Sequence, residues 1–355
     1  MSILHRTTSS ITSLFGTLAV LAACFAPVSA RAAEPPIAPP SLAGAIGWLN
    51  SPPLTLESLR GKVVLVDFWT YSCINCLRTL PHVRAWAERY AAQGLVVVGV
   101  HTPEFAFEKN LANIQRAMQD LKIGFPVAVD SNFAVWRSFQ NRAWPAFYLV
   151  DARGRIRHQQ YGEGDFDATE KMIQALLKES GTDAARKPMP SVALDTRGVG
   201  LPPDMANAKS PETYVGYQQA ESFASPGGIV RERAHAYTPG TPRLNEWGLA
   251  GEWTVQPEFA ELNRAGGSVV VRFHARDLHL VLGRASAGTP LRFRLTLDGK
   301  PPGADHGVDT DADGNGVIDA ERLYQLVRQQ GRIGDRTIEI RFLDPGARAF
   351  AFTFG

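Results

Sequence analysis

Two hydrophobic patterns divide the chain. In the first half, runs of consecutive apolar residues alternate with stretches whose apolar residues recur at helical spacing. The runs at 62–69 and 95–101 are rich in valine, as expected for parallel strands buried on both faces. Between them, apolar residues recur every three or four positions, which predicts a helix with one apolar face. The residues of that face are Leu77, Leu80, Val83, Trp86 and Tyr90.

The same alternation continues to about residue 182. We expect a helix around 107–121, a short strand at 125–130, a short helix at 135–141 and a hairpin whose turn is 151–154. Asp167 followed by Glu170 resembles a capping box at the start of a last helix. These elements predict an α/β domain at 34–182, with a mixed sheet and flanking helices.

The pattern changes in the second half. Residues 183–212 show no sustained period and contain many Gly and Pro, which indicates a linker. Beyond it, apolar residues alternate with polar ones, as at Val269, Val271 and Phe273 and again at Ile338, Ile340 and Phe342. This period of two predicts an antiparallel β-sandwich of the jelly-roll kind at 213–355.

Composition supports two folded units. The chain has 355 residues, of which 45% are hydrophobic and 20% charged. Its formal net charge of +2 is nearly balanced, so neither nucleic acid nor an acidic surface is indicated as a partner.

Residues 1–33 have the features of a secretory signal. Arg6 precedes an apolar run, and small residues that permit cleavage after Ala30 or Ala32 follow it. The run is shorter than a membrane-spanning helix. The alternative is a lipoprotein signal, in which Cys24 would carry the lipid anchor. Either reading predicts an exported, periplasmic protein.

The mature chain then has two cysteines, Cys73 and Cys76, in an oxidising compartment. A strand that leads into a helix through Cys-x-x-Cys places the first cysteine at the helix N-terminus, where the thiolate is favoured. We expect Cys73 to attack a disulfide and Cys76 to resolve it. The alternatives are a structural disulfide, or a zinc site, for which the sequence offers no second ligand pair. No cofactor is expected.

The stretch VLVDFWTYSCINC resembles the active-site strand and helix of thioredoxins. The resemblance covers about 42–180 and implies that Asp67 is the buried acid that moves a proton on and off Cys76. It implies that Pro81 kinks the active-site helix and that Trp69 shields the dithiol. Trp144 and Pro145 match the cis-proline loop, which would dock the substrate chain.

The separation of Cys73 from Pro145 leaves room for an extra helix and strand near 103–130. Such an insertion is typical of the redoxin branch, which includes TlpA-like exported reductases and peroxiredoxins. A peroxidatic cysteine has no partner three residues on, so a thiol peroxidase is the weaker hypothesis. His101 and Glu104 follow a predicted strand and could assist proton transfer, or be ordinary polar groups at its exit.

Further motifs resemble the exported portion of DipZ-type proteins. They are VHTPEF and AWPAFYLVD in the first domain and LNEWGLAGEW, HARDLHLVL and FLDPG in the second. The resemblance implies that the second domain is similar to carbohydrate-binding modules. It also implies a separate membrane protein as electron donor.

Two features of the second domain were candidates for ligand binding. Five aromatic residues could form a sugar-binding surface or pack in the core: Trp247, Trp253, Tyr214, Tyr217 and Tyr237. Residues 311–322 partly match a calcium loop, but Arg322 stands where a bidentate carboxylate is needed. A hairpin turn explains the same residues.

The sequence therefore predicts an exported thiol–disulfide oxidoreductase that reduces protein disulfides, in cytochrome c or envelope-protein maturation. Its partners would be exported thiol or disulfide proteins. The rival hypothesis is a glycan-binding protein that uses the first domain as a scaffold.

Overall fold

The computed structural model describes residues 40–181, 198–286 and 288–355. The expected signal segment, its cleavage sites and Cys24 lie outside these ranges, as does the linker up to residue 197. Pro39–Gly355 forms one compact unit. Two domains can be distinguished within it by their secondary structure.

The first is an α/β domain built on a mixed sheet of six strands among the described residues, in the order β1-β4-β3-β2-β5-β6. The strands are β1 (Gly47–Leu49), β2 (Val63–Trp69), β3 (Leu95–His101), β4 (Val127–Val129), β5 (Ala146–Val150) and β6 (Ile156–Tyr161). β2 pairs with β3 in parallel and with β5 antiparallel. All seven residues of β2 are buried, as the unbroken apolar run predicts.

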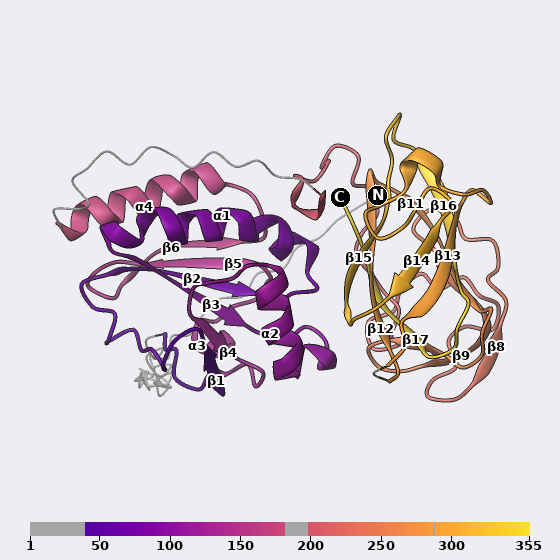
Figure 1. Ribbon diagram of the computed structural model, residues 1–355, viewed down its shortest axis with the longest axis horizontal. Helices are drawn as coiled ribbons and strands as arrows, with labels where there is room; N and C mark the ends of the chain where they lie inside the picture. The colour runs from indigo at the N-terminus through magenta and orange to yellow at the C-terminus, as the bar shows by residue number, and fades with distance from the viewer. Residues whose placement is uncertain (1–39, 182–197, 287) are drawn as a thin grey trace, which may run out of the picture. The chain divides into compact units, whose positions relative to one another are not determined.

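Helices cover both faces of this sheet. They are α1 (Ile74–Tyr90), α2 (Leu111–Asp120), α3 (Ala134–Ser138) and α4 (Phe166–Ser180), with short 3-10 turns η1 (Ala91–Gln93) and η2 (Ala106–Lys109). In Figure 1, α1 and α4 run side by side along one face of the sheet. Leu65 faces their apolar layer, whereas its neighbour Val66 faces the layer that contains Val135 of α3. Alternate strand residues thus build two cores.

The second is a C-terminal β domain, an antiparallel sheet of eleven strands among the described residues. Its long strands are β9 (Trp247–Val255), β11 (Ser268–His274), β12 (Asp277–Arg284), β13 (Leu291–Leu297), β15 (Arg322–Arg328), β16 (Asp335–Phe342) and β17 (Ala347–Phe354). Its short strands are β7 (Thr213–Tyr214), β8 (His235–Tyr237), β10 (Ala260–Leu262) and β14 (Asn315–Ile318). The sheet curls so that two layers share one core, in agreement with the predicted sandwich.

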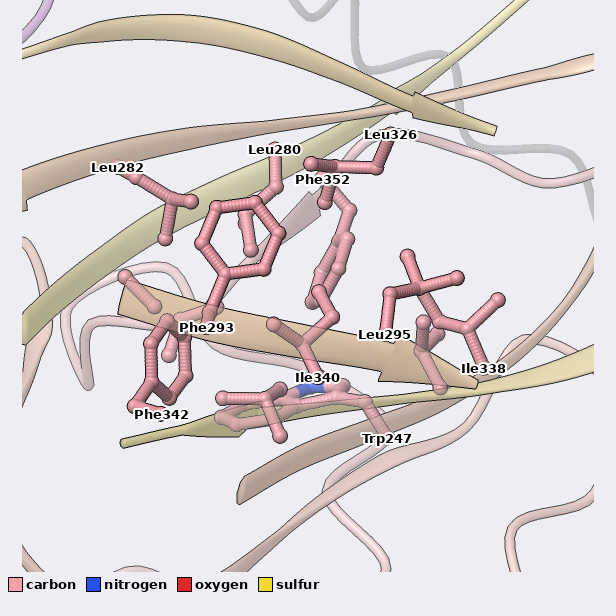
Figure 2. Packing of buried hydrophobic residues seen from close by; sticks show 14 of the residues in the cluster. Trp247, Leu280, Leu282, Phe293, Leu295, Leu326, Ile338, Ile340, Phe342 and Phe352 are labelled. Atoms are coloured by element: carbon pink, nitrogen blue, oxygen red, sulfur yellow. The ribbon is translucent and has the colours of Figure 1, made fainter. Parts of the chain in front are cut away.

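Figure 2 shows how the two layers fill that core. Leu280, Leu282 and Phe352 approach from β12 and β17, and Phe293 and Phe342 approach from β13 and β16. All are nearly fully buried. Each strand therefore directs one of its faces into the core, which explains why apolar and polar residues alternate along it.

The predicted capping box at the start of α4 is wrong. α4 begins after Asp165, which has a left-handed backbone and makes no side-chain cap. Glu170 is buried instead, and its carboxylate accepts a hydrogen bond of 2.5 Å from the Tyr90 hydroxyl. The Glu170 side chain thus makes a tertiary contact with α1, not the local helix cap that the sequence pattern predicted.

The helix predicted at 107–121 is two elements, because Asn110 ends η2 and caps α2 through its side-chain oxygen. Of the linker, the described part contains the 3-10 turn η4 (Gly198–Gly200). A Cβ at Gly200 would lie 3.7 Å from the Cγ atom of Pro81. This part of the linker therefore packs on α1.

The tryptophans cannot form the sugar-binding surface considered above, because Trp247 and Trp253 are fully buried in the core. At the candidate calcium loop, the Asp311 carboxylate accepts hydrogen bonds from the backbone N–H groups of Asp313 and Asn315. Asp319 accepts from the Tyr324 hydroxyl. These carboxylates therefore accept hydrogen bonds within the turn, as predicted for a hairpin turn.

The core of the C-terminal domain gives a stability prediction. Phe342→Ala should lower the free energy of unfolding by about 3–5 kcal/mol, because it leaves a cavity among rings and aliphatic side chains. Val317→Ala, at a 45% exposed side chain of β14, should change it by less than about 0.5 kcal/mol. Guanidinium unfolding measures both. Equal effects of the two substitutions would contradict the packing described here.

Candidate active site

Cys73 lies at the N-terminus of α1, as the residue that caps the helix. Its extended backbone (φ −82°, ψ 115°) enters the helix, and its sulfur accepts a hydrogen bond of 3.3 Å from the Cys76 backbone N–H. Both cysteines are free thiols. Cys73 is partly exposed and Cys76 is only 3% exposed. The Cys73 sulfur is therefore accessible to another molecule, whereas the Cys76 sulfur is buried one helical turn further along α1.

Asp67 lies on β2, behind the dithiol, and is 2% exposed. Burial raises its pKa to about 8, and its Oδ1 atom has no hydrogen-bond partner among the described residues. The pKa of Cys76 is also raised, first by burial and then by its neighbours Cys73 and Asp67. Two weakly acidic groups thus lie near each other in an apolar interior, where a proton can pass between them.

The Trp144–Pro145 peptide bond is cis. It immediately precedes β5, whose first residue Ala146 pairs with Phe68 of β2. The indole N–H of Trp144 donates a hydrogen bond of 3.0 Å to the Thr102 carbonyl. Trp144 and Cys73 line the same cleft. The structure therefore brings together all five of the predicted site residues, namely Asp67, Cys73, Cys76, Trp144 and Pro145, at the ends of β2, α1 and β5.

His101 is a structural residue of the α/β domain. It is fully buried, its ring stacks on that of Tyr71 at 5.5 Å, and burial lowers its pKa to about 3. Its Nε2 atom lies 3.4 Å from the Thr70 hydroxyl. A neutral imidazole enclosed in this way explains the residue without a role in proton transfer.

Glu108 was not identified from the sequence, although its carboxylate organises the loop before Cys73. Its Oε1 atom accepts hydrogen bonds from the Ser72 hydroxyl (2.7 Å) and the Ser72 backbone N–H (3.3 Å). Its Oε2 atom accepts from the backbone N–H groups of Glu104 (2.6 Å) and Phe105 (3.0 Å). The only sequence signal was an acidic residue in an otherwise apolar stretch, FAFE, which resembles a surface position.

A cleft of about 1050 Å³ opens beside Cys73. On the α/β side its wall includes Trp144 and the ion pair of Arg78 with Glu163, whose N–O distance is 3.1 Å. The rest of the wall includes Ser210 and Glu212 of the linker and Tyr214, Thr353 and Phe354 of the C-terminal domain. Cys73 therefore lies in the wall of an open cleft, whereas Cys76 is buried.

Glu104 lies in the same cleft and accepts a hydrogen bond of 2.6 Å from the Tyr214 hydroxyl. Burial and the nearby carboxyl groups of Glu212 and Glu108 raise the pKa of Glu104 to about 8. Near neutral pH this side chain is therefore mainly uncharged. It contributes a polar but largely neutral group to the wall.

Among the residues that the structure describes, no group of three His, Cys, Asp or Glu side chains could hold a metal ion. Within the same ranges, every helix is too short or too polar to cross a bilayer. The site contains two thiols and one buried acid, with the cis-proline loop nearby.

Two families match the chain. The family described as "AhpC/TSA family" matches residues 49–159, and that described as "Thioredoxin like C-terminal domain" matches residues 210–355. A solved structure called "Solution Structure of a Thioredoxin-like Protein in the Oxidized Form" is 34% identical. It covers 39% of this chain and 94% of its own, with a TM-score of 0.37.

Two curated relatives cover different parts of the chain. Protein DipZ of Mycobacterium tuberculosis is 36% identical over 321 residues, which are 89% of this chain and 42% of DipZ. The chain thus spans less than half the length of that relative. Thiol-disulfide oxidoreductase YkuV of Bacillus subtilis is 34% identical over 142 residues, which are 40% of this chain and 95% of YkuV. The chain belongs to the thioredoxin superfamily and is of the TlpA-like and DipZ-like kind.

Proposed function

We propose that the protein reduces disulfide bonds in exported proteins through the Cys73/Cys76 dithiol. The observation that carries the proposal is the pairing of a partly exposed sulfur at a helix N-terminus with a buried sulfur and a buried acid behind it. A scaffold that only binds a ligand needs neither a buried acid nor a second thiol.

The reaction proceeds by two exchanges. The Cys73 thiolate attacks one sulfur of the substrate disulfide, so that a mixed disulfide forms and the other substrate sulfur leaves as a thiolate that takes up a proton. Cys76 then transfers its proton to Asp67 and attacks the Cys73 sulfur. The second substrate thiol is released, and the Cys73–Cys76 disulfide remains. Two electrons have passed to the substrate, and a dithiol donor restores the protein.

The loop at Trp144 and Pro145 supports docking of an extended substrate chain. Pro145 has no N–H, and Trp144 lines the same cleft as Cys73. The Trp144 indole is held by Thr102 and packs on Trp136 at 4.3 Å between ring centroids. A fixed backbone beside the sulfur allows a substrate strand to pair with it while the exchange takes place.

Export and the maturation of cytochrome c or envelope proteins are also part of the proposal. They are supported by the signal-like sequence at residues 1–33 and by solved structures that resemble the α/β domain. One is titled a putative thiol:disulfide interchange protein DsbE, and another an exposed lipoprotein thioredoxin. A separate membrane protein would supply the electrons. The two candidate tryptophans of a glycan-binding surface are buried in the core.

Trapping tests the assignment of the two sulfurs. In Cys76→Ser, the first exchange should proceed and the second should not, because no thiol can release the mixed disulfide. The variant, expressed with exported proteins, should accumulate adducts through Cys73 that non-reducing gels and mass spectrometry detect. Cys73→Ser is the matched control and should form none. If neither variant, or both equally, forms adducts, the proposed exchange is wrong.

The raised pKa of Asp67 predicts a pH dependence of the second exchange. Only the ionised carboxylate accepts the Cys76 proton, so the rate should rise as the pH increases through about 8. Asp67→Asn should be slower by about 10²-fold or more and should lose this inflection. The rate is measured by preparing a mixed disulfide of Cys73 with thionitrobenzoate and following release of the coloured thiolate.

Asp151→Asn is the control for this measurement, because Asp151 is a buried carboxylate in the turn at the far end of β5. It should keep the wild-type rate and inflection. An unchanged pH profile in Asp67→Asn would show that the proton goes elsewhere.

A further inference from the structure

The segment 104–108 joins the loop before Cys73 to the C-terminal domain. On one side, the Glu108 carboxylate accepts both hydrogen bonds from Ser72, the residue that immediately precedes Cys73. On the other side, the same carboxylate fixes the backbone N–H groups of Glu104 and Phe105. One buried side chain therefore ties two pieces of backbone together.

Glu108 has no access to solvent. Both of its oxygens accept N–H hydrogen bonds, which favour the ionised form, whereas burial opposes ionisation and raises the pKa. A carboxyl group placed here without these donors would be strongly unfavourable. The arrangement therefore holds only while both backbone pieces stay in place.

The other face of the segment contacts the C-terminal domain through both rings and hydrogen bonds. Phe350 packs edge to face against Phe107 and Phe105, with ring centroids 4.8 and 5.2 Å apart. The Ala106 backbone N–H donates to Glu258 at 2.8 Å. Tyr214 donates to Glu104, as described above. Residues 104–107 thus each have a partner in the C-terminal domain.

Ile74 extends this contact to the dithiol itself. It follows Cys73 directly, is 3% exposed, and lies in one apolar cluster with Phe105. The C-terminal domain supplies the remaining buried members of the cluster, which are Val281, Leu323, Phe350 and Ala351. The residues on both sides of Cys73, Ser72 and Ile74, are therefore fixed by contacts that meet at segment 104–108.

We propose that Glu108 is a positioning residue for Cys73, and that through segment 104–108 the C-terminal domain sets how readily the dithiol gives up its electrons. The C-terminal domain thus has a proposed role other than ligand binding. The inference rests on the proposed function, because it concerns the same two sulfurs.

The geometry gives the expected direction. Hydrogen bonds to Glu108 hold Ser72, and the apolar cluster holds Ile74, so that Cys73 is fixed close to Cys76. A loosened Cys73 loop lowers the effective concentration of one sulfur at the other, which disfavours the Cys73–Cys76 disulfide relative to the dithiol. Both changes should therefore make the protein a weaker reductant.

The test equilibrates full-length variants with glutathione, in which the protein dithiol and glutathione disulfide exchange with the protein disulfide and two glutathione thiols. Glu108→Gln and Phe350→Leu should each shift the equilibrium toward the reduced protein by at least about threefold. Combined, their effects should be less than additive, since they act on one segment. The alkylation rate of Cys73 at neutral pH should rise in both.

Each variant has a matched control. Glu170→Gln removes a carboxylate that is also buried but lies beside Tyr90, at the other end of α1. Phe342→Leu trims a ring in the core of the C-terminal domain, away from segment 104–108. Both controls should lower stability and leave the equilibrium with glutathione unchanged.

The outcomes separate the two proposals. If the wild-type cysteines form no disulfide in equilibrium with glutathione, the proposed function fails. If they do, and neither Glu108→Gln nor Phe350→Leu differs from its control, the present inference is overturned. Phe350→Leu retains all of the Glu108 contacts, so a folding defect in Glu108→Gln would still leave a decisive variant.

Discussion

The placement of two thiols at different depths at one helix N-terminus is the constraint on which the rest of the structure depends. Cys73 has to be accessible and favoured as a thiolate, whereas Cys76 has to stay protonated until it is needed. The first condition is met where α1 begins, since the Cys73 sulfur is partly exposed there and accepts a hydrogen bond from the Cys76 N–H of the first turn. The second is met by burying Cys76 with Asp67, because the apolar interior disfavours both anions.

This constraint explains why the central strands are so uniformly apolar. β2 contains Asp67 and leads into the loop that carries Cys73, while Pro145 immediately precedes its partner strand β5. A shift of one residue in the pairing of these strands would turn Asp67 to the opposite face of the sheet. Burial on both faces fixes the register, and the register holds the acid behind the dithiol.

The C-terminal domain has a direct structural relation to this site. It forms one wall of the cleft beside Cys73 and packs on the segment that Glu108 ties to Ser72. Its own core contains Trp247 and Trp253, which removes these rings as a ligand surface.

The sequence was informative where one local pattern determines the structure. Cys73, Cys76 and Asp67 lie within one strand-to-helix stretch, and the alternating residues of β13 and β16 predicted the sandwich. The sequence was not informative where a side chain bonds to a segment that is distant in the chain. Glu170 resembled a helix cap but bonds to Tyr90, and Glu108 resembled a surface residue but is fully buried. Neither partner can be recognised from residues that lie nearby in the chain.

The relative reactivity of the two sulfurs tests the account most directly. The reduced protein would be treated with limiting iodoacetamide at pH 7, and mass spectrometry of its peptides would give the alkylation rate at each cysteine. The account predicts that Cys73 reacts at least about tenfold faster than Cys76, since it is the accessible sulfur at the helix N-terminus. Equal rates, or faster reaction at Cys76, would contradict the roles assigned to both.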